Sequence, residues 1–240
     1  MSSPAPLQAV CFDAAGTLFE VRGSVGEIYA RYASRYRREV SPEELEARFG
    51  VAFRQQPVLA FPPGTPEPEL LAYEKAWWRE LVTAVFAGHR EWPTFDHYFD
   101  EVFEFFRTAQ AWRALPEAAP TLAALKARGL KLALISNFDS RVFDVLRALN
   151  LEHFFDIIQI SSRTGAAKPS PVIFQAALAA LGVAPDRALH VGDSWCDDVR
   201  GALRAGLQAA WYAPSAVRLA DNHPAVLQLS RLDQLVARLR

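Results

Sequence analysis

Short apolar stretches alternate with amphipathic ones over the second half of this 240-residue chain, and this alternation constrains the fold more than any other feature. The pattern predicts strands over residues 130–135, 155–160, 188–191 and 208–212, and helices over 121–128, 140–149, 171–181 and 195–205. Apolar strands separated by helices are typical of a parallel sheet that is covered on both faces. We therefore predict an α/β fold with a Rossmann-like parallel sheet.

The first apolar run, residues 8–12, is expected to join that sheet, because it has no other partner. Most of the aromatic residues lie between this run and the alternating half, and their spacing is helical; Phe95, Phe99 and Phe103 share one stripe. The sequence SPEE at residues 41–44 predicts a helix start, and the prolines between residues 61 and 68 divide the segment into two pairs of helices. We predict a core segment of residues 1–18 and 114–240, interrupted by an all-helical cap segment of residues 19–113.

The composition excludes several classes of protein. With 26 basic and 27 acidic residues the net charge is −1, which gives no electrostatic reason to expect a nucleic acid or an anionic membrane as a partner. No run approaches the ~20 apolar residues that span a bilayer, and the N-terminal residues lack the features of a signal peptide. Two cysteines, Cys11 and Cys196, are too few for a disulfide framework. We expect a soluble, cytoplasmic protein, and nothing in the sequence sets its oligomeric state.

Polar residues follow the predicted strands where each one ends. Asp13 follows the first strand, Ser136 and Asn137 follow the second, Asp193 follows the fourth, and Lys168 lies in the loop after the third. Ligands of open α/β sheets bind beyond the carboxyl ends of the strands. We therefore expect these side chains to meet at one rim, with Lys168, one of only four lysines, as a compact positive charge.

Four segments carry a resemblance to a known family. FDAAGTL, ISN, AAKP and VGDSWCDD occur in the order of the four motifs of the haloacid dehalogenase superfamily of aspartate-nucleophile hydrolases, and they span the whole core segment. The cap segment matches the position of the helical cap in that superfamily's capped members. ISNFDSR, AAKPSPVIF and HVGDSWCDDVRGALRAG closely resemble the subgroup called haloacid dehalogenase-like hydrolase domain-containing protein 3, and the pair Trp77-Trp78 is also similar to it.

The resemblance implies a catalytic role for four residues. Asp13 is the expected nucleophile, able to form a covalent intermediate with an electrophile. Ser136 and Asn137 are expected to donate hydrogen bonds to phosphoryl or carboxylate oxygens, and Lys168 to neutralise the nucleophile together with the transferring group.

The resemblance also implies a Mg²⁺ site. Asp13, Asp193 and the backbone carbonyl of Ala15 are expected to bind the ion, since Mg²⁺ prefers hard oxygen ligands. Asp198 is expected to orient these ligands from behind, whereas Asp197 is interpreted as a solvated neighbour. The alternative for Asp193 is a capping role at the helix that follows.

Ala15 is the position at which the sequence departs from the phosphatases of this superfamily. They carry a second aspartate there, which protonates the leaving oxygen, and alanine cannot transfer a proton. One interpretation is a Mg²⁺-dependent phosphohydrolase of weak or specialised activity on a small phosphorylated metabolite, with Asp139 as a candidate replacement acid. A cap that excludes water and macromolecules favours a small substrate.

Three other interpretations are compatible with Ala15. A 2-haloacid dehalogenase releases halide and needs no acid. Dehalogenases of this superfamily use no metal, however, whereas the resemblance implies a metal ligand at Asp193. A phosphonoacetaldehyde hydrolase needs a lysine in the cap, and Lys75 is the only one. The last alternative is a binding module that keeps the phosphate- and metal-binding rim without catalysis.

Overall fold

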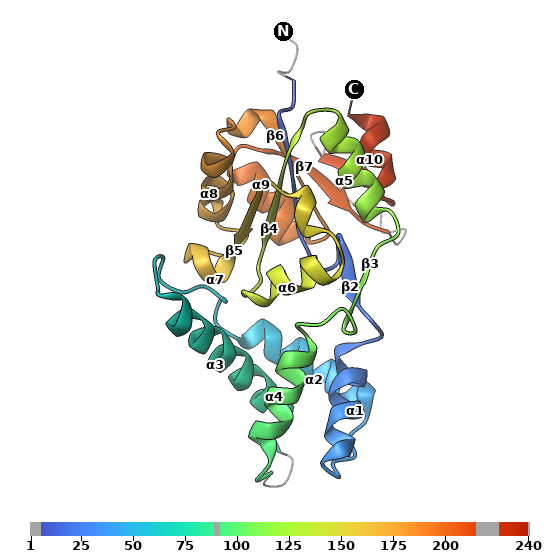
Figure 1. Ribbon diagram of the computed structural model, residues 1–240, viewed down its shortest axis with the longest axis vertical. Coiled ribbons are helices and arrows are strands. Elements are labelled where there is room, and N and C mark those ends of the chain that lie inside the picture. The colour runs from blue at the N-terminus through green and yellow to red at the C-terminus, as the bar shows by residue number, and fades with distance from the viewer. Residues whose placement is uncertain (1–5, 89–91, 215–225, 240) are drawn as a thin grey trace.

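A six-stranded parallel sheet forms the centre of the core segment (Figure 1). The computed structural model describes residues 6–88, 92–214 and 226–239; residues 89–91 of the predicted cap segment and residues 1–5, 215–225 and 240 of the predicted core segment lie outside this description. The strands follow the order β5–β4–β1–β6–β7–β8 across the sheet. In chain order they are β1 (Ala9–Phe12), β4 (Lys131–Ser136), β5 (Ile157–Ile160), β6 (Ala188–Gly192), β7 (Gln208–Tyr212) and β8 (Val226–Leu229).

Helices connect these strands, as the alternation predicts. Ser170 caps α8 with its side chain, Pro171 occupies the first turn, and Gly182 ends the helix in the left-handed region that suits glycine. The expected helix over 195–205 is a π-helix followed by a short α-helix, and the sequence did not predict β8 and the helix after it. The core helices are α5 (Ala118–Ala127), α6 (Arg141–Ala148), α7 (Ser161–Thr164), α8 (Pro171–Leu181), α9 (Gly201–Arg204) and α10 (Asp233–Arg238), with 3-10 helices η1 (Glu152–Phe154) and η2 (Pro185–Arg187) and the π-helix η3 (Trp195–Arg200).

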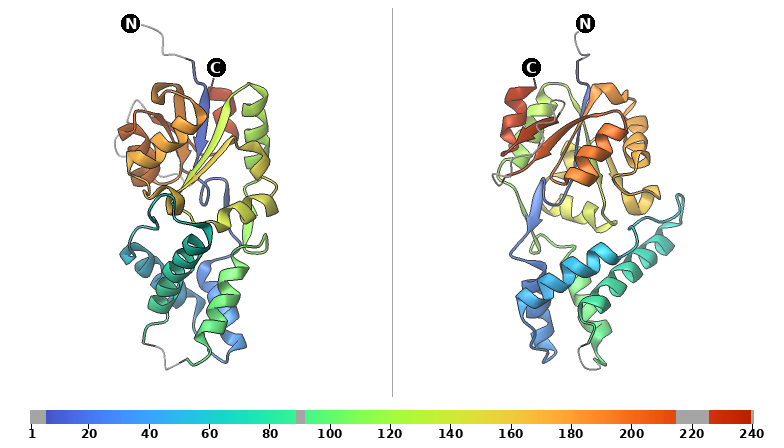
Figure 2. Two further views of the ribbon diagram at one scale, coloured as in Figure 1. Left: turned by 60° about the vertical axis from the view of Figure 1, so that its left-hand side comes forward. Right: turned by 180° about the vertical axis from the view of Figure 1, so that it is seen from behind.

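Both faces of the sheet are buried. Successive side chains of a strand point to opposite faces, so Val10 and Phe12 pack with α5, α6 and α10, whereas Ala9 and Cys11 pack with α8 and α9. All four are fully buried. The α/β, Rossmann-like architecture expected from the alternation is therefore the observed one (Figures 1 and 2).

Four helices make up most of the cap segment and lie below the carboxyl ends of the strands (Figures 1 and 2). Ser24 and Glu27 form a capping box at the first helix, and Ser41 accepts a hydrogen bond from the backbone of Glu44 at the second, as the SPEE motif predicts. Aromatic side chains fill the space between the helices, and Tyr98 is fully buried among them. The helices are α1 (Val25–Arg35), α2 (Pro42–Gln55), α3 (Glu67–Val85) and α4 (Phe95–Phe105).

A two-stranded antiparallel ribbon joins the cap segment to the core segment. It consists of β2 (Phe19–Val21) and β3 (Trp112–Ala114), so the segment expected to be all-helical begins and ends in short strands. Three residues are too few to show an alternating pattern. The ribbon forms through contacts between distant residues, since the Phe19 and Trp112 rings meet edge to face at 5.3 Å. We retain the proposed boundaries after residues 18 and 113, because both chain crossings lie in this ribbon.

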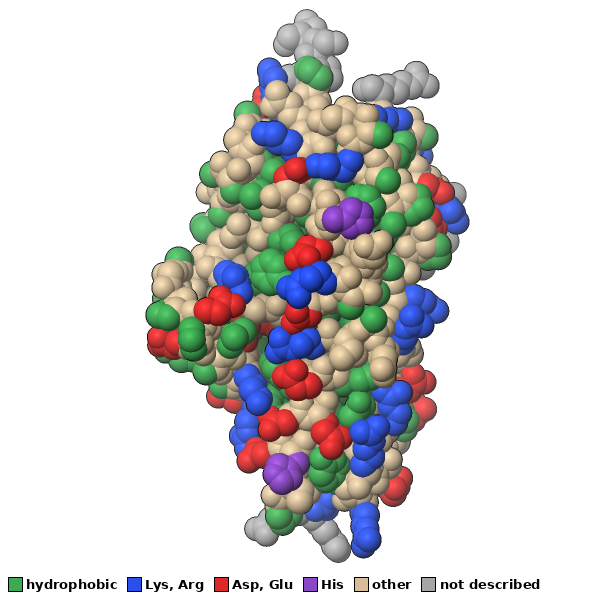
Figure 3. Space-filling view, in the orientation of Figure 1, with side chains coloured by type: hydrophobic (Ala, Val, Ile, Leu, Met, Phe, Trp, Pro, Cys, Tyr) green, Lys and Arg blue, Asp and Glu red, His purple; other side chains and the backbone are tan. Residues whose placement is uncertain are grey.

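Charges of both signs are mixed over the face seen in Figure 3, which includes parts of both segments. Ion pairs form both within the cap segment and between the two segments: Lys75 pairs with Asp100 at 2.8 Å, and Arg107 pairs with Asp144 at 2.8 Å. Within the described residues, no helix combines the length and the apolar character needed to cross a bilayer.

Candidate active site

The order of the strands brings the predicted site residues to one edge of the sheet. β1 lies between β4 and β6, and Phe12 is in register with Leu134 on one side and Val191 on the other. Since the strands are parallel, Asp13 and Asp193, which follow β1 and β6, and Ser136, the last residue of β4, meet at the same edge.

Asp13 lies in the middle of this group and is almost completely buried. Its Oδ1 accepts hydrogen bonds from Ser136 Oγ at 3.0 Å and from Lys168 Nζ at 2.5 Å. Burial raises the pKa of Asp13, the ammonium of Lys168 opposes that rise, and the charge of Asp198 adds to it. The result is a carboxylate held in one orientation at the end of a rigid strand, as a nucleophile requires.

Lys168 links two carboxylates. Its Nζ lies 2.5 Å from Asp13 Oδ1 and 2.6 Å from Asp198 Oδ1, and the side chain is buried. Burial alone lowers the pKa of a lysine, but the charges of Asp13 and Asp198 more than reverse this, so that the pKa of Lys168 is raised. The ammonium therefore stays charged at neutral pH.

Asn137 fixes the loop that carries Lys168. Its Nδ2 donates to the backbone oxygen of Lys168 at 3.0 Å, and its Oδ1 accepts from the backbone nitrogen of Lys168 at 2.7 Å. The structure thus brings Asn137 to the site, with its amide already committed to the lysine backbone. The two hydrogen bonds of Asn137 therefore hold the backbone of Lys168 in position.

Three carboxylates could hold a cation at this edge. One ligand oxygen from each of Asp13, Asp193 and Asp198 lies within 4.8 Å of the others. The side chain of Asp193 reaches solvent, yet the surrounding protein still displaces water from it and raises its pKa to about 6, and the charges of Asp13 and Asp198 add to the rise. A divalent cation would relieve this repulsion, and hard oxygen donors are the ligands that Mg²⁺ prefers. The residues present therefore fit the ion.

Asp198 differs from the other two carboxylates because both of its oxygens have protein partners. Oδ1 accepts from Lys168 and lies 2.9 Å from His190 Nε2, and Oδ2 accepts from the backbone nitrogen of Ser194 at 3.0 Å. Burial raises the pKa of Asp198, but the charge of Lys168 and the hydrogen bonds to His190 and Lys168 outweigh this effect and lower the pKa. Such an arrangement suits a residue that orients the ligands from behind. Asp197 does not belong to the group of three carboxylates that could hold a cation.

Ala15 and Gly16 form the turn after Asp13. Ala15 is partly exposed at the site. Gly16 has φ +89°, and a Cβ there would lie 2.6 Å from Asp193 Oδ2. Glycine is therefore required both by the backbone conformation and by the close approach of Asp193.

Asp139 does not suit the role of a replacement acid. Its carboxylate is fully buried and pairs with Arg141 through contacts of 2.7 and 2.9 Å. Burial raises the pKa of a carboxyl group, but the charge of Arg141 outweighs this effect and lowers the pKa of Asp139. Asp139 is therefore ionised at neutral pH and has no proton to donate. Its Oδ2 also accepts from Trp78 Nε1 of α3 at 2.5 Å, so that the group connects the core segment to the cap segment.

Sequence reasoning missed several residues that support the site. Thr17 Oγ1 lies 3.3 Å from Asp193 Oδ1, and Trp211 Nε1 donates to the backbone oxygen of Asp193 at 2.8 Å. His190 contacts Asp198 from β6. Thr17 lies within the FDAAGTL motif, and its closeness to Asp13 was the one available signal. Trp211 and His190 lie within strands, where nothing in the sequence separates them from ordinary core residues.

The comparison with known proteins agrees with the motifs. The haloacid dehalogenase-like hydrolase family matches residues 7–206. The chain belongs to that family. Haloacid dehalogenase-like hydrolase domain-containing protein 3 from Mus musculus is 34% identical over 211 residues, which cover 87% of this chain and 83% of the relative. The resemblance to this subgroup is thereby confirmed.

Two further relatives carry the names of different activities. Phosphoserine phosphatase from Thermus thermophilus is 43% identical over 108 residues, which cover 45% of this chain and 43% of that enzyme. The crystal structure of 2-haloacid dehalogenase from Pseudomonas syringae pv. tomato superimposes with a TM-score of 0.68 at 25% identity, and covers 98% of this chain and 100% of the other. Proteins named for both activities therefore resemble this chain, and the choice between the activities depends on the site.

Proposed function

We propose that the protein is a Mg²⁺-dependent phosphohydrolase of small phosphorylated molecules, with Asp13 as the nucleophile. The observation that carries the proposal is the pairing of Asp13 with Lys168 beside Asp193. A dehalogenase needs the nucleophile and no cation site, whereas this rim gathers three carboxylates, of which two pair with Lys168. The phosphatase-named relative supports the same choice.

Each residue has a proposed task. Asp13 attacks phosphorus, Ser136 holds the attacking carboxylate in place, and Lys168 offsets the negative charge of the carboxylate and of the phosphoryl group as they approach. Asp13, Asp193 and the backbone carbonyl of Ala15 would hold the ion, which would supply further positive charge to the site. Asn137 and Asp198 keep Lys168 in position. We also propose, from the sequence composition, that the protein is cytoplasmic and does not bind nucleic acid.

Labelling of Asp13 tests the proposal directly. We expect incubation with acetyl phosphate and Mg²⁺ to add one phosphoryl group to the protein, and peptide mass spectrometry to locate it on Asp13. Asp13→Asn and wild-type protein with chelator are the matched controls, and both should stay unlabelled. Absence of any adduct on Asp13 together with no turnover of phosphate esters would refute the phosphohydrolase and leave a dehalogenase or a binding module as the alternatives.

A second candidate, 2-haloacid dehalogenase, is favoured by one observation. Position 15 carries alanine, and halide leaves without a proton. Release of halide from 2-chloropropionate in the presence of chelator, lost in Asp13→Asn, would support this candidate against the phosphohydrolase.

A further inference from the structure

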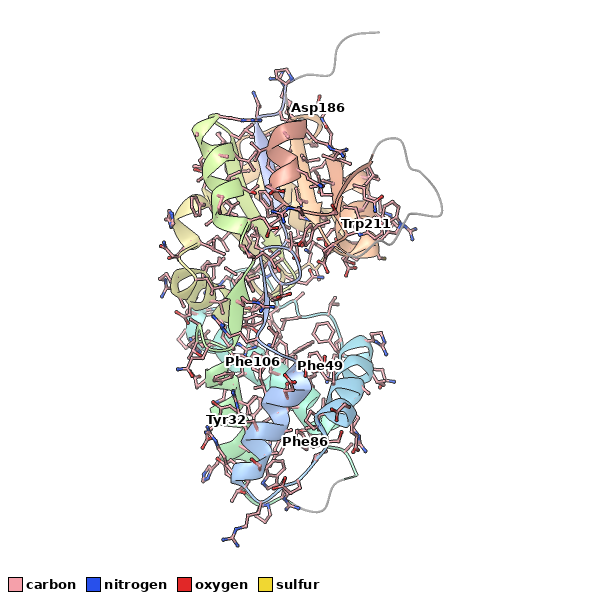
Figure 4. The ribbon with its side chains drawn as sticks, turned by 90° about the vertical axis from the view of Figure 1, so that its right-hand side faces the viewer. Tyr32, Phe49, Phe86, Phe106, Asp186 and Trp211 are labelled. Atoms are coloured by element: carbon pink, nitrogen blue, oxygen red, sulfur yellow. The ribbon has the colours of Figure 1, made fainter. Side chains whose placement is uncertain are left out.

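A cavity of about 340 Å³ lies between the cap segment and the edge of the sheet. Both segments contribute to its walls, and most of the lining side chains are apolar. Figure 4 shows Phe49 and Phe106 at the end of the cap segment that faces the core, whereas Tyr32 and Phe86 lie farther away. The aromatic lining includes Phe49, Phe53, Trp77, Trp78, Phe106 and Trp112.

The cavity begins where the chemistry is proposed to take place. Ala15 and Asn137 line it, and they lie two residues after Asp13 and one residue after Ser136. The part of a substrate that leaves from phosphorus at Asp13 would therefore lie beside Ala15 and enter the aromatic cavity. An apolar cavity of ~150 Å³ is large enough for benzene, so this one can hold a substituted ring.

The indole N–H groups of the wall already have protein partners. Trp77 Nε1 donates to the backbone oxygen of Pro57 at 2.9 Å, and Trp112 Nε1 donates to that of Phe106 at 2.8 Å. Trp78 Nε1 is bound by Asp139. The indole N–H groups are therefore not free to bind a substrate, and the guanidinium of Arg141, which also lines the cavity, is paired with Asp139. Sugar hydroxyls or an amino group placed there would lose hydrogen bonds to water with little in return.

The apolar cavity favours an apolar leaving group, and the alanine at position 15 adds a condition on its pKa. Without an acid beside it, the leaving oxygen departs as an anion. A phenol has a pKa of about 10, whereas an aliphatic alcohol resembles water, with a pKa near ~16. An aromatic alcohol satisfies this condition and also fits the walls of the cavity.

We propose that the substrates are phosphate monoesters of aromatic alcohols, held with the ring in the cavity between the two segments. This inference rests on the proposed phosphohydrolase function. A carboxylate oxygen of Asp13 forms a bond to phosphorus while the bond from phosphorus to the phenolic oxygen breaks. The phenolic oxygen keeps the electron pair and takes a proton from water. A second water then attacks the phosphorus of phospho-Asp13, the bond to the carboxylate oxygen breaks, and inorganic phosphate leaves.

Two esters of similar size distinguish a preference for an aromatic alcohol from a preference for any bulky group. We expect kcat/KM for phenyl phosphate to exceed that for cyclohexyl phosphate by about 10²–10⁴, the factor that an acid would otherwise supply to the alkyl ester. A binding measurement removes leaving-group chemistry from the comparison. Phenylphosphonate should bind about 10- to 100-fold more tightly than methylphosphonate, the ratio that burial of one phenyl ring supplies.

Two variants of α2 link this preference to the cavity. Phe53 lines the cavity and is 46% exposed, and its ring lies 6.0 Å from that of Trp77. Phe53→Ala should reduce the preference for phenylphosphonate over methylphosphonate about 2- to 10-fold. Val51 is 47% exposed on the same helix and is not among the lining residues, so Val51→Ala should leave the preference unchanged.

The outcomes distinguish this inference from the function on which it rests. If acetyl phosphate labels Asp13 but phenyl phosphate is no better than cyclohexyl phosphate, or phenylphosphonate binds no more tightly than methylphosphonate, the aromatic assignment is wrong and the phosphohydrolase stands. An equal effect of Phe53→Ala and Val51→Ala would also overturn the assignment. If no phosphate compound labels Asp13 or is hydrolysed, the phosphohydrolase falls and the inference falls with it.

Discussion

Replacement of Arg141 tests the buried ion pair that connects the two segments. Arg141 is the first residue of α6, and its guanidinium forms two hydrogen bonds to Asp139 and one to the backbone oxygen of Phe103. Its charged end also lies 4.8 Å from the centre of the Trp78 ring and 4.0 Å from that of Phe103. Arg141→Met keeps the apolar stem and removes the charge.

The expected loss of stability follows from what remains around Asp139. The carboxylate is fully buried, and only Trp78 Nε1 and the backbone nitrogen of Arg141, at 2.8 Å, still donate to it in the variant. Removal of one partner of a buried pair costs about 3–5 kcal/mol. We expect a loss of about 3 kcal/mol in the free energy of unfolding at pH 7.5, near the lower limit, because two donors remain. The double variant Asp139→Asn/Arg141→Met should recover most of that loss.

The loss should depend on pH. In the native protein the pKa of Asp139 is lowered, so its contribution to stability is complete above the unfolded value of about 3.9 and decreases as the pH falls toward the folded pKa. Without Arg141, burial raises the pKa instead, and the variant gains stability relative to wild type as Asp139 takes up a proton. The difference between the two proteins should therefore shrink between pH 7.5 and pH 5.

Urea unfolding followed by tryptophan fluorescence and circular dichroism measures these differences. Arg147→Met is the matched control, because Arg147 lies on the same helix, is 59% exposed and pairs with Asp144 at 2.9 Å. A surface pair of this kind contributes less than ~1 kcal/mol. If Arg141→Met destabilises the protein no more than Arg147→Met does, or if its loss is the same at both pH values, the argument from a buried unpaired charge is refuted.

Three further predictions concern the rim. Ala15→Asp should raise kcat/KM for an alkyl phosphate such as cyclohexyl phosphate by about 10²–10⁴ if only the acid is missing; an unchanged rate in a steady-state assay would contradict this. Asp193 has a pKa of about 6, and its carboxyl must lose its proton to bind the ion. The affinity for Mg²⁺, measured by calorimetry, should therefore be constant above this pH and fall about tenfold per pH unit below it. A flat profile from pH 5 to pH 7 would count against Asp193 as a ligand. Gly16→Ala should abolish Mg²⁺ binding, because the new Cβ meets Asp193. Gly88→Ala is its control, since Gly88 has a similar φ of +85° and no atom of the described residues lies within 4 Å of the new Cβ. Equal binding defects in the two variants would show that backbone strain alone is responsible.

The sheet and its rim could be predicted because they depend on local patterns. The apolar stretches mark the strands, and parallel strands place their carboxyl ends at one edge, so the contact of Asp13 with Ser136, 123 positions away, follows from topology. The preference for Asp198 over Asp197 rested on the residues that follow it in the sequence. In the structure Asp198 is the one of the two that bonds to Lys168.

Contacts between separate segments could not be predicted in this way. The bond from Trp78 to Asp139 joins residues 61 positions apart, and nothing in either local sequence indicates it. Asp139 was therefore interpreted as a possible acid, although its neighbour Arg141 lies only two positions away and fixes it as an anion. The ribbon of β2 and β3 was missed for the same reason, because each strand is stabilised only by the other.

That ribbon has a consequence for how proteins of this kind can change. Glu20 and Arg113 are paired across β2 and β3, so the chain leaves the core segment and returns to it at adjacent points. The whole insert could be exchanged for another, or replaced by a short turn, without altering the order of the six strands or the residues at their ends. Selection for a new specificity can therefore act on the insert while the rim of Asp13, Lys168 and Asp193 is inherited unchanged.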